Sequence, residues 1–547
     1  MHHHARVLLT IGLAGGLLMA CSSTNDAAAP VVSPAITAPG STTSDPVAST
    51  PSNTDAAATT STVADRPLQA GAQRLHFEIG PIDIKPGQNN IDFTKGAIPK
   101  PAVDGWIVRI APDLRLADGS IPGVDVIHLH HGVWLNSSAK DSTSRLPERF
   151  FAAGEEKTTM VLPVGYGYHY TASDNWTLNY MIHNLWPDEK QVWVTYDLDF
   201  IPADSAAAVG ITPARPIWTD VQNGSLYPVF DVIKGSGRDG IYTYPDDAMS
   251  PYGDAAAKNV WTVDRDGVLL VTAGHLHPGG LRTDMWLQRT GATALAGHAK
   301  AGAPDTAHLF ESLANYYEPA GAVSWDVSMT ATPEAWRVAV HAGDVLSTTA
   351  TYDSARASWY ESMGIMIAWM ADAPAPSEGP AADPFTTAVD VKGELTHGHL
   401  AENDNHGGAV DARYFDAAKL PSQPAAAPVQ IADFIYAQGD MLRGDAIPTI
   451  APGGSITYEN LDAPLGNGEW HTITSCKAPC NAATGIAYPL ADADIQFDSG
   501  QLGNAGVPTA GRVTWSTPTD LPAGTYTYFC RIHPVMRGAF RIGTGAP

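Results

Sequence analysis

A cysteine, a histidine and a methionine follow one another at intervals of three residues near the end of the chain, at Cys530, His533 and Met536. A thiolate and an imidazole hold Cu(I) and Cu(II) about equally well, and a weak thioether on the axis tunes the reduction potential. Such a site needs one more imidazole from upstream, and His471, in the alternating stretch from Glu469 to Thr474, supplies it. These residues predict a type 1 (blue) copper site. The alternative is a buried cysteine and a hydrogen-bonded histidine in a β-sandwich.

The stretch from Val429 to Ile542 resembles the cupredoxins, of the plastocyanin type, because the four ligands occur in that family's order. The resemblance implies a Greek-key β-sandwich that transfers single electrons. The loop at Cys530 has no histidine flanking the cysteine, so it cannot connect to a trinuclear copper cluster. A multicopper oxidase is therefore disfavoured.

More histidines cluster in the middle of the chain, starting with the stretch Ile-His-Leu-His-His-Gly that begins at Ile127. In a strand, His128 and His130 share one face, and His131 faces the other way unless the strand ends there. Burying several imidazoles without partners is costly, so this cluster favours metal binding. The alternative for any one of them is a hydrogen-bonded core residue.

Three further features follow along the chain. His183 lies in an apolar alternation, which by itself favours a core position. His275 and His277 project to the same side of a strand, a spacing that lets two imidazoles bind one ion. Met363 lies in the apolar run from Glu361 to Met370, where a methionine is core by default.

In this order the features resemble the copper type II, ascorbate-dependent monooxygenases, the family of peptidylglycine α-hydroxylating monooxygenase and dopamine β-monooxygenase. The family pattern is a His-His pair, a third histidine after a Gly-rich aromatic stretch, a His-x-His and a methionine, here within residues 74–372. The resemblance implies two jelly-roll-like sandwiches with one copper each. It implies an electron-donor copper on the first, held by His130, His131 and His183, and a catalytic, oxygen-binding copper on the second, held by His275, His277 and Met363.

The chain departs from the peptide-amidating members of that family. Where they hold the substrate carboxylate with Arg, Asn and Tyr, this chain has Ala273, Ile365 and Ile367, and the family's disulfides are missing. An apolar or neutral small molecule, hydroxylated at a C–H bond, suits such a pocket better than a peptide carboxylate. The resemblance implies O2 and a reductant, ascorbate or a redox protein, as partners. The cupredoxin is a candidate carrier of electrons to the donor copper.

The first 21 residues combine Arg6, a hydrophobic run from Val7 and small residues before Cys21. The run is too short to span a membrane and is typical of a secretion signal. The residues before Cys21 look like a bacterial lipoprotein processing site, so Cys21 would be lipidated and hold the protein on the outer side of the cell membrane. The alternative to an enzyme is a non-enzymatic copper-binding or electron-transfer lipoprotein.

Two other groups of residues remain. Cys476 and Cys480 are four residues apart, and in an oxidising compartment they predict a disulfide, with free thiols or a second metal site as alternatives. Residues 373–427 are rich in Ala and Pro and predict a linker. The linker contains a candidate metal site or docking surface, although solvated loop histidines are common: His397, His399 and His406, near Glu402 and Asp404.

Short alternating runs punctuated by Gly, Pro, Asp and Asn predict an all-β chain of two jelly-roll-like sandwiches and a cupredoxin Greek-key sandwich. A length of 547 residues accommodates three or four domains. The net charge of −25 argues against nucleic acid and anionic lipid as partners, so the lipid anchor is the only expected membrane contact. The predicted parts are a signal peptide (1–21), a disordered Ser/Thr/Ala/Pro tether (22–70), two sandwiches (71–203 and 204–372), the linker (373–427) and the cupredoxin (428–547).

Overall fold

The computed structural model describes residues 61–225, 227–253, 255–289, 305–317, 325–404, 409–465, 469–483, 495–503 and 512–543. The residues from Thr60 onwards form one compact unit. The predicted signal peptide, Cys21 and the predicted tether up to residue 60 lie outside the described residues, as does His406. Val63 is buried against Val161 and Ala331, so ordered structure begins before residue 71.

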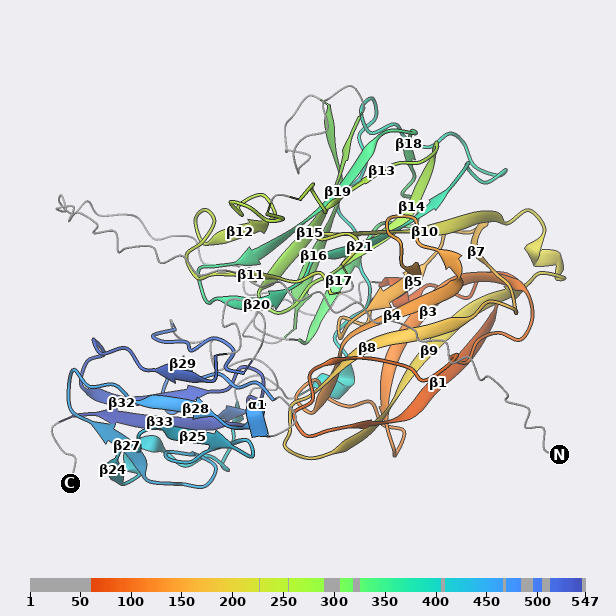
Figure 1. Ribbon diagram of the computed structural model, residues 1–547. Helices are drawn as coiled ribbons and strands as arrows, with labels where there is room; N and C mark the ends of the chain where they lie inside the picture. Colours follow the sequence, from red (N-terminus) through yellow and green to blue (C-terminus); the bar gives the residue numbers. More distant parts are fainter. Residues whose placement is uncertain are drawn as a thin grey trace, which may run out of the picture. The chain divides into compact units, whose positions relative to one another are not determined.

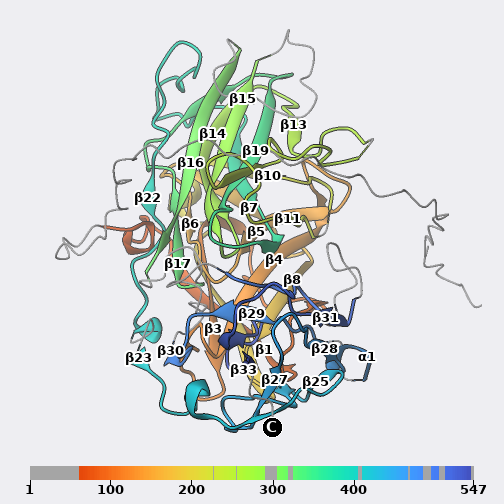
Figure 2. The same ribbon diagram turned by 90° about the vertical axis from the view of Figure 1, so that its left-hand side faces the viewer.

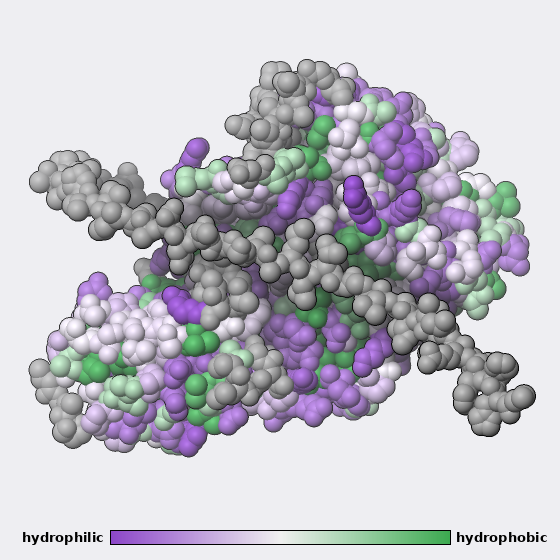
Figure 3. Space-filling model, in the orientation of Figure 1, coloured by the Kyte–Doolittle hydropathy of each residue, from purple (hydrophilic) through white to green (hydrophobic). Residues whose placement is uncertain are grey.

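The described residues are almost entirely β, which confirms the predicted fold class (Figure 1). Their helices are short: α1 (Asp462–Leu465) and the 3-10 turns η1 (Val63–Asp65), η2 (Ala206–Ala208), η3 (Ala401–Asn403) and η4 (Ala417–Lys419). Among the described residues, no helix is both long and apolar enough to cross a membrane. Polar and apolar residues are interspersed on the face seen in Figure 3.

The first sandwich has one sheet in the order β1-β9-β3-β7 and a second in the order β2-β8-β4-β5. Large aromatic residues such as Trp134, Trp176 and Tyr196 fill the core between them. The strands are β1 (Gln73–Ile84), β2 (Ile91–Phe93), β3 (Gly105–Leu116), β4 (Ile127–Lys140), β5 (Pro147–Ala153), β6 (Met160–Val161), β7 (Tyr166–Tyr170), β8 (Trp176–Asn184) and β9 (Lys190–Pro202).

The second sandwich continues the first sheet through a short parallel pairing of β7 with β10, and its strands follow the order β10-β21-β14-β17-β16-β15-β19-β12. Figure 2 shows β14, β15, β16 and β19 of this sandwich together. Leu269, Phe310 and Met366 belong to its core. The strands are β10 (Thr212–Asp220), β11 (Phe230–Val232), β12 (Ile241–Tyr244), β13 (Val260–Thr262), β14 (Gly267–His275), β15 (Gly280–Gln288), β16 (Thr306–Tyr316), β17 (Val327–Ala331), β18 (Val338–Val340), β19 (Val345–Asp353), β20 (Trp359–Ser362) and β21 (Ile365–Ala371).

The Ala/Pro-rich linker packs along the second sandwich instead of crossing solvent. Strand β22 (Glu394–Leu395) pairs with β17, and the Arg337 guanidinium forms an ion pair of 2.7 Å with Glu378. Further on, the side chain of Asn403 accepts a hydrogen bond from the Val124 N–H of the first sandwich. The linker therefore holds contacts with both sandwiches.

The C-terminal sandwich pairs a sheet of order β24-β27-β33-β32-β29 with one of order β26-β25-β28-β31. Cys476 and Cys480 are joined by a disulfide at its edge. The strands are β23 (Ala409–Val410), β24 (Ser422–Pro424), β25 (Val429–Ala432), β26 (Ile435–Tyr436), β27 (Ile447–Ile450), β28 (Thr457–Asn460), β29 (Thr474–Cys476), β30 (Ala482–Ala483), β31 (Thr514–Ser516), β32 (Gly524–Phe529) and β33 (Arg537–Ile542).

One buried carboxyl makes the stability of the first sandwich dependent on pH. Burial raises the pKa of Glu148 to about 7, although a hydrogen bond from Tyr168 opposes the shift. The fold keeps a proton that the unfolded chain releases above its ordinary pKa of 4.5, so stability is lost as pH rises from 4.5 to about 7. A glutamine at position 148 stays neutral at every pH, so Glu148→Gln does not lose this stability. Between the two ends of the window its free energy of unfolding should therefore rise by up to roughly 3 kcal/mol relative to that of the wild type.

Denaturant unfolding of both proteins at the two ends of the window measures this gain. The matched control is Glu189→Gln at an exposed position, which should follow the wild type at both pH values. An equal difference between Glu148→Gln and the wild type at the two pH values would contradict the prediction.

Candidate metal centres

The four predicted type 1 ligands come together in the C-terminal sandwich. The Cys530 Sγ lies 3.8 Å from Nδ1 of His471 and 3.8 Å from Nδ1 of His533, and all three residues are fully buried. Met536 is buried in the same core cluster. The Cys530 N–H donates to the carbonyl of Met536, which closes the ligand loop after β32. The spacing in sequence is therefore matched by proximity in space.

Hydrogen bonds prepare the Cys530 sulfur to act as a thiolate. The backbone N–H groups of Thr472 and His533 each lie 3.4 Å from Sγ. Burial raises the pKa of Cys530, but the neighbouring His471 and these two donors lower it more, so the pKa lies below its usual value. Two imidazoles, a thiolate and a buried thioether are the donor set of type 1 copper, so the residues fit that ion.

The carboxylate of Asp462, the first residue of α1, orients one of these ligands. It lies 2.8 Å from Nε2 of His471, which leaves Nδ1 to face the sulfur. Losing such a partner typically weakens metal binding about 10- to 100-fold. We therefore expect Asp462→Asn to release type 1 copper to a chelator at a correspondingly lower chelator concentration. Asp445→Asn removes only an ion pair with Arg443 and is the matched control. Equal copper retention by the two variants would contradict the prediction.

A second group of metal-capable side chains lies where the two middle sandwiches meet. One ring nitrogen from each of His130, His131 and His277 lies within 4.8 Å of the others, and all three residues are buried. We call them the three-histidine group. Burial and the neighbouring imidazoles hold the pKa of each ring below its usual value, to about 3 for His131. The rings are therefore neutral at neutral pH, the form that binds a metal.

A β-bulge explains how adjacent residues of β4 reach one site. The pairing of β4 with β8 shifts register between Leu129 and His131, so His130 is the extra residue. A bulge re-aims side chains that strict alternation would send to opposite faces. The Leu129 N–H there donates to the buried carboxylate of Glu155 at 2.9 Å. His130 and His131 can therefore both face His277.

Hydrogen bonds fix the orientation of the two histidines from the second sandwich. Nδ1 of His277 lies 2.6 Å from the carbonyl oxygen of Glu361, and Nδ1 of His275 lies 2.9 Å from the carboxylate of Glu156. Each Nδ1 thus donates its hydrogen, and each Nε2 is buried without a hydrogen-bond partner among the described residues. Carbonyl or carboxylate partners of this kind typically orient metal-bound histidines. The buried, unpartnered nitrogens fit a copper ion.

The other residues implied by the monooxygenase resemblance lie near this group. The ring of His183 is 6.4 Å from that of His130, and the ring of His275 is 5.2 Å from that of His277, measured between centroids. Met363 packs in an apolar cluster with Trp218. The Tyr352 hydroxyl accepts hydrogen bonds from the backbone N–H groups of His277 and Met363, so it links the two segments.

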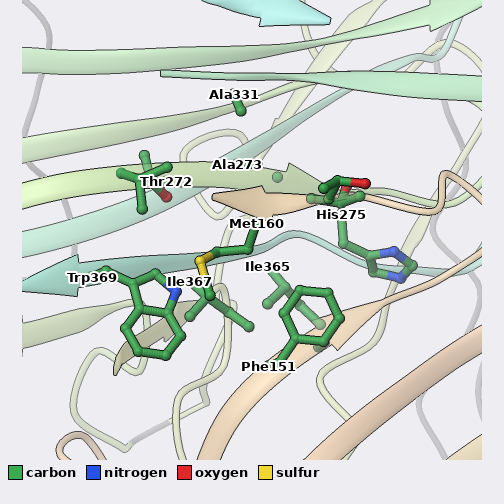
Figure 4. A pocket seen from close by; sticks show the side chains of 14 residues that line it. Phe151, Met160, Thr272, Ala273, His275, Ala331, Ile365, Ile367 and Trp369 are labelled. Atoms are coloured by element: carbon green, nitrogen blue, oxygen red, sulfur yellow. The ribbon is translucent and has the colours of Figure 1, made fainter. Parts of the chain in front are cut away.

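An apolar pocket reaches His275 between the two sandwiches, lined by β5 and β6 of the first and by β14, β17 and β21 of the second (Figure 4). Its cavity volume is about 30 Å³, and about 460 Å³ of non-protein space surrounds this cavity when the open mouth is included. The three positions where the peptide-amidating family members bind a carboxylate all line it, as Ala273, Ile365 and Ile367. Thr158, Thr159 and Thr272 add hydroxyls. The remaining walls are mostly apolar: Phe151, Ala152, Met160, Val271, Gly274, Ala331 and Trp369.

A second, more polar pocket, with a cavity volume of about 80 Å³, lies against the three-histidine group. His130, His183 and His277 contribute to its wall, and so do Arg531 and Ile532 from the type 1 ligand loop. Residues of both candidate metal centres therefore line the same pocket.

His533, a predicted type 1 ligand, also contacts the first sandwich directly. Its Nε2 lies 3.2 Å from the carbonyl oxygen of Gly87, and its ring centroid is 5.9 Å from that of His183. Gly87 has a φ of +60°, and a Cβ there would lie 2.9 Å from Nε2 of His533. Only glycine suits both the backbone conformation and this close approach.

The linker histidines have other partners in the structure. The ring nitrogens of His397 each lie 2.6 Å from a carbonyl oxygen, one from that of Gly398 and the other from that of Glu156. His399 lies 3.2 Å from Asp326 and 3.5 Å from Asp404. His397 thus joins the linker to the loop that orients His275.

Sequence reasoning missed several residues of these sites. Glu156 and Gly87 act through contacts with residues distant in the chain, and Asp462 contacts His471 nine residues away. No local pattern marks any of the three. The bulge at His130 also has no signal in the alternation of residues. The sequence signal for Glu156 is that it is one of two consecutive acidic residues that follow the apolar stretch ending at Gly154.

Comparison with known proteins gives little further information. No protein-family model matches the chain, and no curated protein matches its sequence. A reduced mutant of amicyanin is 19% identical over 25% of this chain and 98% of its own, with a TM-score of 0.14. The copper-containing nitrite reductase (NirK) from Thermus scotoductus SA-01 is 16% identical over 51% of this chain and 55% of its own, with a TM-score of 0.15. Scores this low have no weight for fold or function.

Proposed function

We propose that this chain is a copper-dependent monooxygenase that hydroxylates a C–H bond of an apolar or neutral small molecule, with electrons supplied through its cupredoxin domain. The observation that supports it most is the apolar pocket that ends on His275, whose ring is 5.2 Å from that of His277 in the three-histidine group. The reaction R–H + O2 + 2 e⁻ + 2 H⁺ → R–OH + H2O balances atoms and charge.

Copper bound by the three-histidine group would supply the one-electron chemistry through which O2 reacts. The protein's own contribution is to hold the ligands. Hydrogen bonds to Glu361 and Glu156 orient His277 and His275, and the bulge orients His130 and His131. Burial and the neighbouring imidazoles keep the rings neutral.

The pocket supports a choice of substrate class. Ile365, Ile367 and Ala273 offer no charge to a carboxylate, and a buried unpaired charge there would be costly. Trp369 and Phe151 add flat apolar walls suited to a hydrocarbon or an aromatic ring. A charged substrate is therefore disfavoured at this pocket.

The contact of His533 with the first sandwich supports electron supply within the chain. A type 1 ligand lies against Gly87 and 5.9 Å from the ring of His183, itself a wall of the cavity that reaches the three-histidine group. Two single-electron deliveries along this route would meet the demand of one turnover. Ascorbate or a redox protein would then reduce the type 1 site from outside.

The other candidate function is a non-enzymatic copper-binding or electron-transfer protein. The unpartnered, buried nitrogens of the three-histidine group favour copper binding whether or not O2 reacts there. The two functions differ in whether O2 uptake depends on an organic substrate.

The test is O2 uptake by the copper-loaded full chain with ascorbate and a panel of small apolar compounds. A monooxygenase gives substrate-dependent uptake and a product one oxygen atom heavier, with the label from ¹⁸O2. If the type 1 site is reduced and reoxidised but no compound raises O2 uptake, the protein has the non-enzymatic function.

The location is part of the same proposal. We propose that the chain is anchored at Cys21 on the outer side of a bacterial cell membrane. The Cys476–Cys480 disulfide supports this, because such bonds persist in oxidising compartments. Mass spectrometry of the mature N-terminus tests it.

A further inference from the structure

His128 and His183 form a pair that no other centre uses. They are register partners on the neighbouring strands β4 and β8, and their ring centroids are 4.8 Å apart. His128 is fully buried and His183 is 4% exposed. The monooxygenase resemblance assigns no role to His128, and it places His183 with His130 and His131, which here face His277 instead.

All four ring nitrogens of this histidine pair lack a hydrogen bond of acceptable geometry among the described residues. The backbone carbonyls of Val124 and Ile532 lie toward His128 and His183, respectively, but outside acceptable hydrogen-bond geometry. Two neutral imidazoles buried side by side without partners are costly, unless an ion uses their lone pairs.

The surroundings of the pair indicate which ion would bind. Imidazole suits copper, whereas structural zinc sites almost always have four protein ligands. No carboxylate among the described residues hydrogen-bonds to either ring, and the cost of burying an ion rises steeply with its charge. A monovalent ion with few ligands fits best, which is the character of Cu(I).

We propose that His128 and His183 bind a Cu(I) ion of their own, separate from the type 1 site and from the three-histidine group. His183 lines the polar pocket, which gives the ion a path of entry. The His183 ring is 5.9 Å from that of His533, and the His128 ring is 6.2 Å from that of His130. The ion therefore neighbours both other centres. This site goes beyond the proposed reaction and does not depend on it.

The test is the number of copper ions per full-length chain after anaerobic loading with Cu(I) and removal of excess with a weak chelator. We expect His128→Phe and His183→Phe each to bind one ion fewer than the wild type, and the double variant also to bind one fewer. His128→Phe combined with His131→Phe should lose one ion more than His131→Phe alone. The matched control is His169→Phe, an exposed histidine beside Trp106, which should lose none.

Two further measurements separate loss of the ion from loss of the fold. The visible absorption of the type 1 site after oxidation should be unchanged in His128→Phe. His128→Met should regain the ion, because a thioether also binds Cu(I). Wild-type copper content in both single Phe variants would overturn the proposal. So would a double variant with His131→Phe that loses no more than His131→Phe alone. If the protein binds this ion but hydroxylates no compound, the proposed function is wrong and the Cu(I) site stands.

Discussion

His277→Ala is expected to lower O2-dependent hydroxylation by at least about 100-fold, because loss of a ligand should exceed the 10- to 100-fold loss caused by replacing a ligand's partner. His277 comes from the second sandwich, whereas His130 and His131 come from β4 of the first. Without it, one ring nitrogen of the three-histidine group is missing. The type 1 site shares no ligand with this group and should keep its full visible absorption. Substrate-dependent O2 uptake and copper content are the two readouts.

The matched control for His277→Ala is His308→Ala in the same sandwich. The ring of His308 stacks on Trp286 and lies 2.9 Å from Asp284, away from both centres. Its removal should leave turnover and copper content unchanged. If His277→Ala retained wild-type turnover with the type 1 site intact, the reaction would not take place at the three-histidine group.

Gly87→Ala is expected to slow electron transfer from the type 1 site to the rest of the chain. A Cβ there would lie 2.2 Å from a ring carbon of Phe434 and 2.9 Å from Nε2 of His533, so one side of the contact must move. Rapid mixing of the fully reduced protein with O2 and substrate measures the return of the type 1 absorption, which should be slower in the variant.

Gly119→Ala separates this displacement from backbone strain. Gly119 has a φ of +83°, in the left-handed region, but no atom lies within 4 Å of the position of its Cβ. It should show the strain of an alanine in that conformation and no change in the electron-transfer rate. Equal rates for Gly87→Ala and the wild type would show that electrons do not pass through the contact of His533 with the first sandwich.

The sequence predicted those parts of the sites that are encoded locally. Cys530, His533 and Met536 lie in one loop, so their spacing in the sequence already brings them close in space. His471 lies on a neighbouring segment and completes the group. The replacement of polar residues by Ala273 and Ile365 predicted an apolar wall, and both residues line the pocket beside His275. Alternation and turn residues likewise predicted the all-β fold.

The grouping of the middle histidines was not predictable in this way. Strict alternation separates His130 from His131, and only the bulge, which depends on pairing with β8, brings both to one side. His277 joins them because the two sandwiches pack together, an arrangement that depends on contacts far apart in the chain. The linker composition, rich in Ala and Pro, also gave no sign that His397 would bond to the Glu156 carbonyl.

Copper content resolved by type, from the integrated paramagnetic resonance spectrum of the oxidised, copper-loaded full chain, tests the central claim most directly. We expect one type 1 signal and at least one type 2 signal, with the type 2 signal lost in His277→Ala and the type 1 signal retained. A spectrum with type 1 copper alone, in a protein whose total copper is one ion per chain, would contradict it.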